Sequence, residues 1–175
     1  MRDVSLRDTI RADLAANRGS LKGKVVVVSY RLAHQVRGTG RAPVWAAPIL
    51  AAYRFAIDWV LGVEIPPLVQ AGPGLGVFHG TGLVVHSGTR LGSNCTLRQG
   101  VTIGARGDGD GPDGQAPVLG DRVDVGVGAL IIGPYVVGDD AVIGAGAVVV
   151  SDVPAGAVVA GNPARVISSA TGEDN

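Results

Sequence analysis

The sequence predicts a mainly β fold, a parallel β-helix whose coils stack into a three-sided prism, preceded by a short α-helical N-terminal segment. Three observations predict it. Aliphatic residues recur at every sixth position between residues 65 and 149, glycine accounts for 28 of 175 residues, and aromatic residues make up only 4% of the chain. A core with so few aromatic side chains needs a regular way of burying small aliphatic ones. Stacked repeats do this in continuous columns.

The first element is predicted to be a helix. Ser5 and Asp8 have the spacing of a capping box, and the helix should run through Asn17 and stop at Arg18-Gly19.

Residues 22–36 allow two assignments. The run VVVVS is typical of a strand, whereas SYRLAHQV continues with helical spacing until Gly38-Thr39-Gly40. A further helix is expected from about residue 44 to 61, with Pro48 near its first turn. Arg54 and Asp58 stand four residues apart there and should pair on one face.

From residue 63 the period becomes six. Twelve of the thirteen repeat positions are Ile, Leu or Val: Ile65, Ala71, Val77, Val85, Leu91, Leu97, Ile103, Leu119, Val125, Ile131, Val137, Ile143 and Val149. Glycine often follows directly, and small residues or Val stand four positions after each aliphatic one. Three such units make one triangular coil of about 18 residues, with glycines at corners where a positive φ or a close backbone approach is needed.

Two interruptions break this period. Two extra residues separate Val77 from Val85, in a segment that contains His79, and ten extra residues separate Ile103 from Leu119. The second insertion, RGDGDGPDGQAP, is polar and rich in glycine, which indicates an exposed loop. We therefore divide the chain into a helical N-terminal segment (1–62), a β-helix domain (63–167) and a polar C-terminal tail (168–175).

Composition excludes several classes of protein. The 15 basic and 15 acidic residues balance, and no basic block occurs, so nothing favours a nucleic-acid partner. Cys95 is the only cysteine and cannot form an intrachain disulfide. The N-terminus lacks an apolar signal region, and Arg54 and Asp58 interrupt the apolar stretch 42–62. We expect a cytoplasmic protein with at most peripheral membrane contact.

The runs GVFHGTGLVVHSGTRLGSNCTLRQGVTIG (76–104) and VIGAGAVVVSDVPAGAVVAGNPARVI (142–167), with the loop between them, resemble the hexapeptide-repeat acyltransferase superfamily, and within it the serine O-acetyltransferase branch. The lead-in, with KGKVVVVSYRLAHQV and WAAPILAAYRFAIDWVLGVEI, is most similar to colanic-acid-type exopolysaccharide acetyltransferases. The resemblance implies a left-handed parallel β-helix. It also implies homotrimers with active sites between subunits, acetyl-CoA as acyl donor, and no metal.

The resemblance also implies site residues. His79 corresponds to the family's general base and Glu64 to its acidic partner, where Asp is usual. Ala105, Gly128, Ala145 and Arg165 correspond to the cofactor-binding positions, the first three along the pantetheine arm and Arg165 near the nucleotide phosphates. The chain departs from the pattern at Ser151, where Lys is common near the cofactor.

The acceptor site departs as well. Serine acetyltransferases carry an Arg-His pair in the long loop, and Gln115 and Ala116 stand there in this chain. Loss of that cation removes a charge-assisted bond of about 1.5–3 kcal/mol to an amino-acid carboxylate. The pattern therefore favours a sugar or polysaccharide hydroxyl over L-serine.

Acyl transfer to an alcohol needs a base, and a histidine whose pKa lies near working pH is suited to that task. A carboxylate on its other ring nitrogen would fix the tautomer. His34 and His86 are interpreted as structural, and Cys95 as a small core residue rather than a nucleophile. Glu64 could equally be an exposed residue at the junction between helices and prism.

Three other functions remain open. Serine O-acetyltransferase is the first alternative. A γ-type carbonic anhydrase needs three zinc-binding histidines, and only His79 and His86 fall within the predicted prism. An inactive scaffold would keep the prism and lose the chemistry, which the insert histidine argues against.

Overall fold

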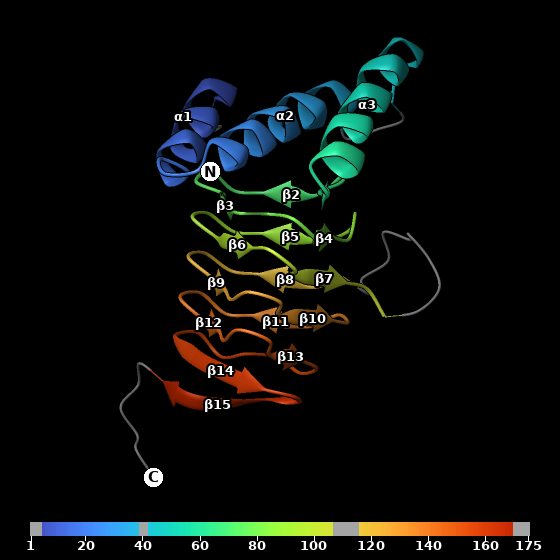
Figure 1. The fold of residues 1–175 in the computed structure, drawn as a ribbon. Helices are drawn as coiled ribbons and strands as arrows, with labels where there is room; N and C mark the ends of the chain where they lie inside the picture. The colour runs from blue at the N-terminus through green and yellow to red at the C-terminus, as the bar shows by residue number, and fades with distance from the viewer. Residues whose placement is uncertain (1–4, 39–41, 107–115, 170–175) are drawn as a thin grey trace.

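The computed structural model describes residues 5–38, 42–106 and 116–169, with three helical segments at one end of a stack of β-coils (Figure 1). The strands are β1 (Val63–Glu64), β2 (Gln70–Ala71), β3 (Gly76–Phe78), β4 (Leu83–Val85), β5 (Arg90–Leu91), β6 (Thr96–Arg98), β7 (Thr102–Gly104), β8 (Val118–Leu119), β9 (Asp124–Val125), β10 (Leu130–Ile132), β11 (Val136–Val137), β12 (Val142–Ile143), β13 (Val148–Val149), β14 (Ala157–Gly161) and β15 (Ala164–Ser169).

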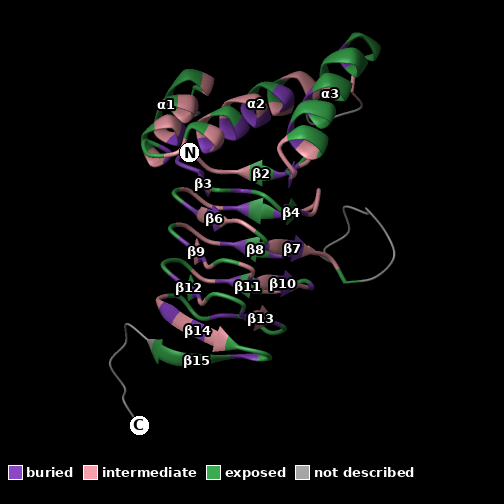
Figure 2. Cartoon of the chain, viewed as in Figure 1, coloured by how far each residue is buried: buried purple, intermediate pink, exposed green. Residues whose placement is uncertain are grey.

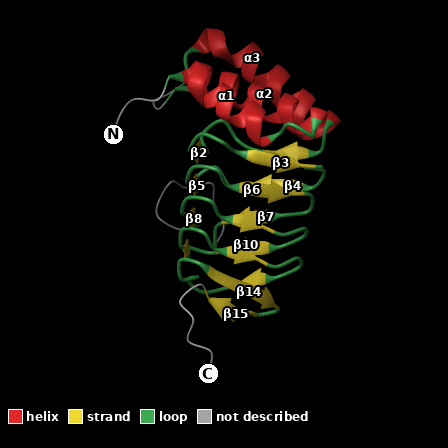
Figure 3. Cartoon of the chain, turned by 90° about the vertical axis from the view of Figure 1, so that its left-hand side faces the viewer, coloured by secondary structure: helices red, strands yellow, loops and turns green. Residues whose placement is uncertain are grey.

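These strands form three sheets, one on each side of the prism (Figure 3). Face A has the order β1-β4-β7-β10-β13, face B has β11-β8-β5-β2, and face C has β15-β14-β12-β9-β6-β3. Up to β13, successive strands fall on successive faces, so the four coils from β1 to β12 each contribute one strand to each sheet, and neighbouring coils pair in parallel. The predicted left-handed parallel β-helix is confirmed.

The six-residue columns form the core (Figure 2). Every predicted aliphatic position is buried except Ala71, which is half-buried. The small-residue column is also buried, and Cys95, Ala129, Ala141 and Ala147 are all 0% exposed. The period therefore predicted which side chains point into the prism.

Glycine is required at corners mainly by close approach between coils. A Cβ on Gly92 would lie 2.4 Å from the carbonyl oxygen of Gly120, and one on Gly126 would lie 2.6 Å from the backbone nitrogen of Ala145. Both separations are shorter than van der Waals contact allows, and the obstacle is backbone that cannot move aside.

The first helix is confirmed. Helix α1 spans Leu6–Ala16, and the Ser5 side chain caps it by accepting from the backbone N–H of Asp8. The ambiguous segment that follows is one helix, α2 (Leu21–Arg37), capped by Ser20 and ended by Gly38 with φ +61°. Its buried residues (Gly23, Val26, Val27, Tyr30, Arg31 and Ala33) recur with helical spacing, so burial on one face overrides the strand propensity of the valine run.

The predicted third helix is confirmed but irregular. A 3₁₀ turn (Val44–Ala46) leads into α3 (Ala47–Arg54), and a π-helical turn (Phe55–Val60) completes it. Arg54 and Asp58 pair as expected, with 3.4 Å between Nε and Oδ2. Across the described ranges, no helix has the length and apolar character needed to cross a bilayer.

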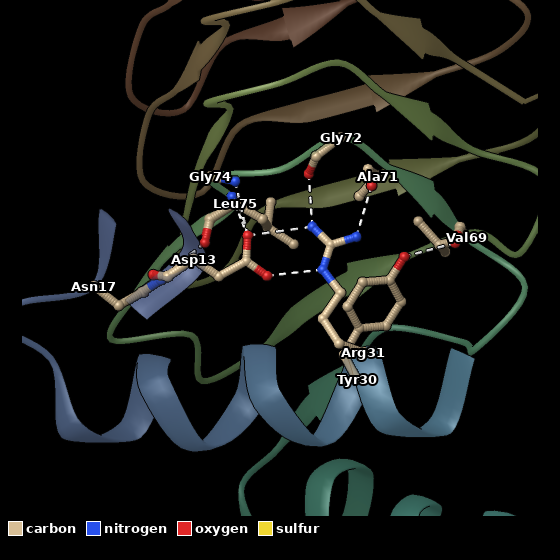
Figure 4. A network of polar contacts seen from close by, with 9 residues as sticks. All are labelled: Asp13, Asn17, Tyr30, Arg31, Val69, Ala71, Gly72, Gly74 and Leu75. Carbon is tan, nitrogen blue, oxygen red and sulfur yellow. Dashed lines mark hydrogen bonds and ion pairs between the residues drawn. The ribbon is translucent and has the colours of Figure 1, made fainter. Parts of the chain in front are cut away.

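The helices close the open edge of the first coil (Figure 4). The Arg31 guanidinium donates to the carbonyl oxygens of Ala71 and Gly72, both at 2.6 Å, and the Tyr30 hydroxyl donates to that of Val69 at 2.6 Å. The Tyr53 hydroxyl donates in the same way to Ile65 at 2.7 Å. A sheet edge leaves backbone groups unpaired, and here side chains of the helical segment pair them.

At the other end, β15 pairs antiparallel with β14 and ends the stack. From residue 170 the proposed C-terminal tail lies outside the described residues.

Candidate active site

The edge where face C turns into face A, here called the C–A edge, runs the length of the prism. Corner hydrogen bonds connect its successive coils: Gly100 N–H donates to Thr81 O (3.0 Å), Gly128 N–H to Gln99 O (3.0 Å) and Gly146 N–H to Val127 O (2.8 Å). Any group at one of these corners is therefore held in line with the corners above and below it.

His79 lies at the top of the C–A edge, in the two-residue insertion between β3 and β4. Its φ is +62°, a value that residues other than glycine rarely adopt. The Gly80 N–H donates to the Phe78 carbonyl oxygen at 2.8 Å, which closes a three-residue turn with His79 at its centre. This is a γ-turn with a positive central φ, the rarer and strained form. Strain of this kind persists where the surrounding structure enforces it, and it clusters at functional sites. The imidazole is exposed.

Glu64 does not meet His79 in this chain. It is exposed on face A, next to Val84, and no hydrogen bond or ion pair between Glu64 and His79 occurs in the described part of the chain. Glu64 instead lines a cavity of about 390 Å³ between the helical segment and the first coils, with Arg37, Tyr53, Arg54 and Asp58 among the other lining residues. The Glu64–His79 pair is thus a proposal for the assembled, substrate-bound enzyme.

Burial shifts the pKa values of two side chains that line this cavity, Asp58 and Tyr53. Burial raises the pKa of the Asp58 carboxyl, the neighbouring Arg54 opposes this, and Glu64 adds a smaller upward effect. Burial also raises the pKa of the Tyr53 hydroxyl, which keeps it protonated as the donor to Ile65.

Two of the cofactor-binding candidates, Gly128 and Ala145, occupy successive corners of the C–A edge below His79. Strands in a sheet lie about 4.8 Å apart, so Ala145, three coils down, is roughly 14 Å from the His79 corner. Cβ atoms placed on Gly128 or on the next corner, Gly146, would meet nothing within 4 Å. These corners expose bare backbone, as the approach of a long thin ligand requires.

The remaining two candidates lie on different edges of the prism. Arg165 is exposed in β15 and pairs with Ala160 of β14. Ala160 lies beside Gly144, since a Cβ on Gly144 would be 3.1 Å from the Ala160 Cβ, so Arg165 stands at the bottom of the C–A edge. Ala105 follows β7 and lies at the opposite end of face A, where that face turns into face B. One chain therefore places His79, Gly128, Ala145 and Arg165 along one edge, with Ala105 on the opposite edge of face A.

The acceptor positions are only partly described. Ala116 is half-buried at the start of the segment that leads into β8, while Gln115 and most of the predicted loop lie outside the described residues.

The other histidines and the cysteine have structural contacts. His34 Nδ1 lies 2.7 Å from Pro67 O, at the edge of the first coil that the helices close. His86 Nδ1 accepts from Gly88 N–H at 3.1 Å. Cys95 is buried, its Sγ is 3.1 Å from Gly120 O, and burial raises the pKa of its thiol to about 11. In the described ranges no group of three or more His, Cys, Asp or Glu is arranged to hold a metal.

Sequence reasoning missed two residues next to the insert. Lys22, at the start of α2, donates from Nζ to Thr81 Oγ1 at 2.6 Å, and the Asn17 carboxamide binds the backbone at Leu75 and Val77. The available signal was weak: Lys22 is a cation in the first turn of a helix, where the macrodipole disfavours positive charge.

No protein-family model matches the chain. Serine acetyltransferase from Helicobacter pylori (strain ATCC 700392 / 26695) is 39% identical over 142 residues, covering 81% of this chain and 79% of that protein. WcaB from Escherichia coli K12, assigned as an acetyltransferase of colanic acid biosynthesis, is 36% identical over 159 residues, covering 88% of this chain and 96% of its own length. The solved structure of soybean serine acetyltransferase apoenzyme superposes with a TM-score of 0.81 at 33% identity, covering 93% of this chain and 69% of that one.

Proposed function

Because the chain belongs to the hexapeptide-repeat acyltransferases, in the branch that holds the serine acetyltransferases and WcaB, we propose that it moves an acetyl group from acetyl-CoA to a hydroxyl of a sugar or polysaccharide precursor. Membership makes the chain an acyltransferase. The acceptor, the donor and the residues that act on them are the proposal. The observation that carries it is the position of His79, in a strained turn at the head of the C–A edge, above the open glycine corners.

His79 is the general base. It accepts the hydroxyl proton as the acceptor oxygen attacks the thioester carbonyl carbon, and this is typically worth about 10²–10⁴-fold in rate. It then donates the same proton to the sulfur as the carbon–sulfur bond breaks, so that CoA leaves as the thiol. The acetyl group passes directly between the two substrates without an acyl-enzyme.

Glu64 stabilises the imidazolium. A carboxylate bonded to the second ring nitrogen selects the tautomer that presents the other nitrogen to the acceptor. Backbone N–H groups of the glycine-rich coils stabilise the oxyanion of the tetrahedral intermediate.

The C–A edge binds acetyl-CoA. The backbone at Gly128 and Ala145 follows the pantetheine arm, and Arg165 binds the nucleotide phosphates by charge-assisted hydrogen bonds. Ala105, on the other edge of face A, contributes to a site of a neighbouring subunit in a homotrimer. The enzyme acts in the cytoplasm, residues 63–167 form its catalytic domain, and residues 1–62 cap it.

A sugar hydroxyl is the preferred acceptor for two reasons. Neither Gln115 nor Ala116 supplies a cation for an amino-acid carboxylate. WcaB, a relative assigned to colanic acid biosynthesis, aligns with this chain over 96% of the length of WcaB. L-serine is the second candidate, because the 39% identity to a serine acetyltransferase favours it.

The test is an acetyl-CoA assay. CoA release is followed with a thiol reagent in the presence of L-serine or a panel of free sugars and nucleotide sugars, with the wild type and His79→Ala compared at equal oligomeric state. Turnover with a sugar, lost in His79→Ala, supports the proposal. Turnover with L-serine alone would make the protein a serine O-acetyltransferase. Full activity of His79→Ala would reject His79 as the general base.

A further inference from the structure

We propose that the N-terminal helices position the strained turn that carries His79, and that Lys22 is the positioning residue through which they do so. The inference rests on the proposed role of His79 and goes beyond it, because it assigns the helical segment a part in catalysis as well as in closing the prism.

The contact itself joins two distant parts of the chain. Lys22 Nζ donates to Thr81 Oγ1 at 2.6 Å, and Thr81 lies two residues after His79 in the insertion. Lys22 stands in the first turn of α2, capped by Ser20, with no acidic residue nearby in that turn. A cation there opposes the helix macrodipole, so local helix stability does not explain it.

A second anchor lies on the other side of His79. The Asn17 side chain accepts from Val77 N–H at 2.8 Å and donates to Leu75 O at 2.8 Å. Helix α2 approaches so closely here that a Cβ on Gly23 would lie 2.2 Å from Val77 O. The helices therefore hold the chain two residues before His79 as well as two residues after it.

The turn between these anchors needs such support. His79 has φ +62° and Gly80 has φ +61°, and no hydrogen bond to the imidazole is found among the described residues. The ring position thus depends on the backbone of the turn. The strained backbone is in turn held by Lys22, Asn17 and the corner bond from Gly100 N–H to Thr81 O.

Loosening one anchor should reduce the rate without altering donor binding. A displacement of about 1 Å at a catalytic group can cost about 10²-fold. The Gly128 and Ala145 corners that we assign to acetyl-CoA lie two and three coils below the insertion, whereas Lys22 bonds to the insertion itself. We expect Lys22→Met to lower kcat about tenfold and to leave KM for acetyl-CoA within about twofold.

The experiment compares Lys22→Met, Thr81→Val and the double variant with Lys24→Met, a control that removes a second cation from the same helical turn. Lys22→Arg is the conservative rescue. Each variant is assayed for kcat and for KM of acetyl-CoA with L-serine and the sugar panel, and its melting temperature is recorded. Hydrogen exchange of residues 79–83 is followed by mass spectrometry, which needs no acceptor.

The proposal expects equal, non-additive losses in Lys22→Met and Thr81→Val, faster exchange in residues 79–83, partial rescue by Lys22→Arg and wild-type behaviour of Lys24→Met. It is overturned if Lys22→Met matches Lys24→Met both in hydrogen exchange of residues 79–83 and in kcat. It is also overturned if the loss of kcat across the variants follows the loss of melting temperature alone. Loss of activity in His79→Ala alongside an unaffected Lys22→Met would reject this inference and leave the proposed function standing. An active His79→Ala would reject the function, and the exchange data would still decide whether Lys22 holds the turn.

Discussion

Asp13 and Arg31 form a buried ion pair, with 2.7 Å between Oδ2 and Nε, where the helical segment meets the first coil of the prism (Figure 4). Asp13 also accepts from the backbone N–H groups of Gly74 and Leu75 at 2.8 and 2.9 Å. Both charges are thus surrounded by partners, which is the condition under which a buried pair is tolerated.

Breaking this pair should be severely destabilising. In Asp13→Ala, Arg31 keeps its charge without its partner and two backbone N–H groups lose their acceptor. We expect the free energy of unfolding to fall by about 3–5 kcal/mol, measured by urea denaturation. Arg122→Met, which removes the exposed Arg122–Asp140 pair, is the control and should change stability little. A comparable loss in both variants would contradict this interpretation.

Glu64 should influence the rate more than the fold. Glu64→Gln keeps the shape of an exposed side chain and removes the charge that stabilises the imidazolium. We expect kcat to fall at least tenfold with little change in melting temperature, and Glu64→Asp to retain most of the activity. The assay is CoA release under saturating acetyl-CoA. If Glu64→Gln turned over like the wild type, Glu64 would be a residue of the cavity and not a catalytic partner.

Cys95 should be inert in the folded protein. Burial raises the pKa of its thiol to about 11, above its ordinary value near 9, so the reactive thiolate is suppressed at neutral pH. A pKa raised by folding means that the contribution of Cys95 to stability is complete below about pH 9 and is lost as pH rises towards 11. Labelling with a thiol reagent at pH 8 should therefore be slow until denaturant unfolds the chain.

A Cys95→Ala variant separates this effect from other alkaline titrations. Its stability should fall less than that of the wild type between pH 9 and 11. Rapid stoichiometric labelling of the native protein at pH 8 would show that the column around Cys95 opens to solvent.

Local patterns were sufficient for the prism because its repeat is short. Each of the aliphatic positions from Val77 to Val149 faces inward, since a six-residue unit repeats the same turn and the same inward direction. The run of valines in α2 could not be assigned in the same way. Its helical state depends on which face of the segment packs against the first coil, and that coil lies some forty residues further along the chain.

The sequence by itself determined the coil, the inward columns, the place of the His79 insertion and, through resemblance, the family. Only the tertiary structure decided how the parts meet: Glu64 lines a cavity under the helices, Ala105 lies across face A from the other cofactor positions, and Lys22 and Asn17 hold the turn around His79. The physical reason is range. Periodicity and turn chemistry act over a few residues, whereas the contacts of Lys22 and Asn17 with the turn bridge about sixty residues. No local pattern records which distant backbone a helix will contact.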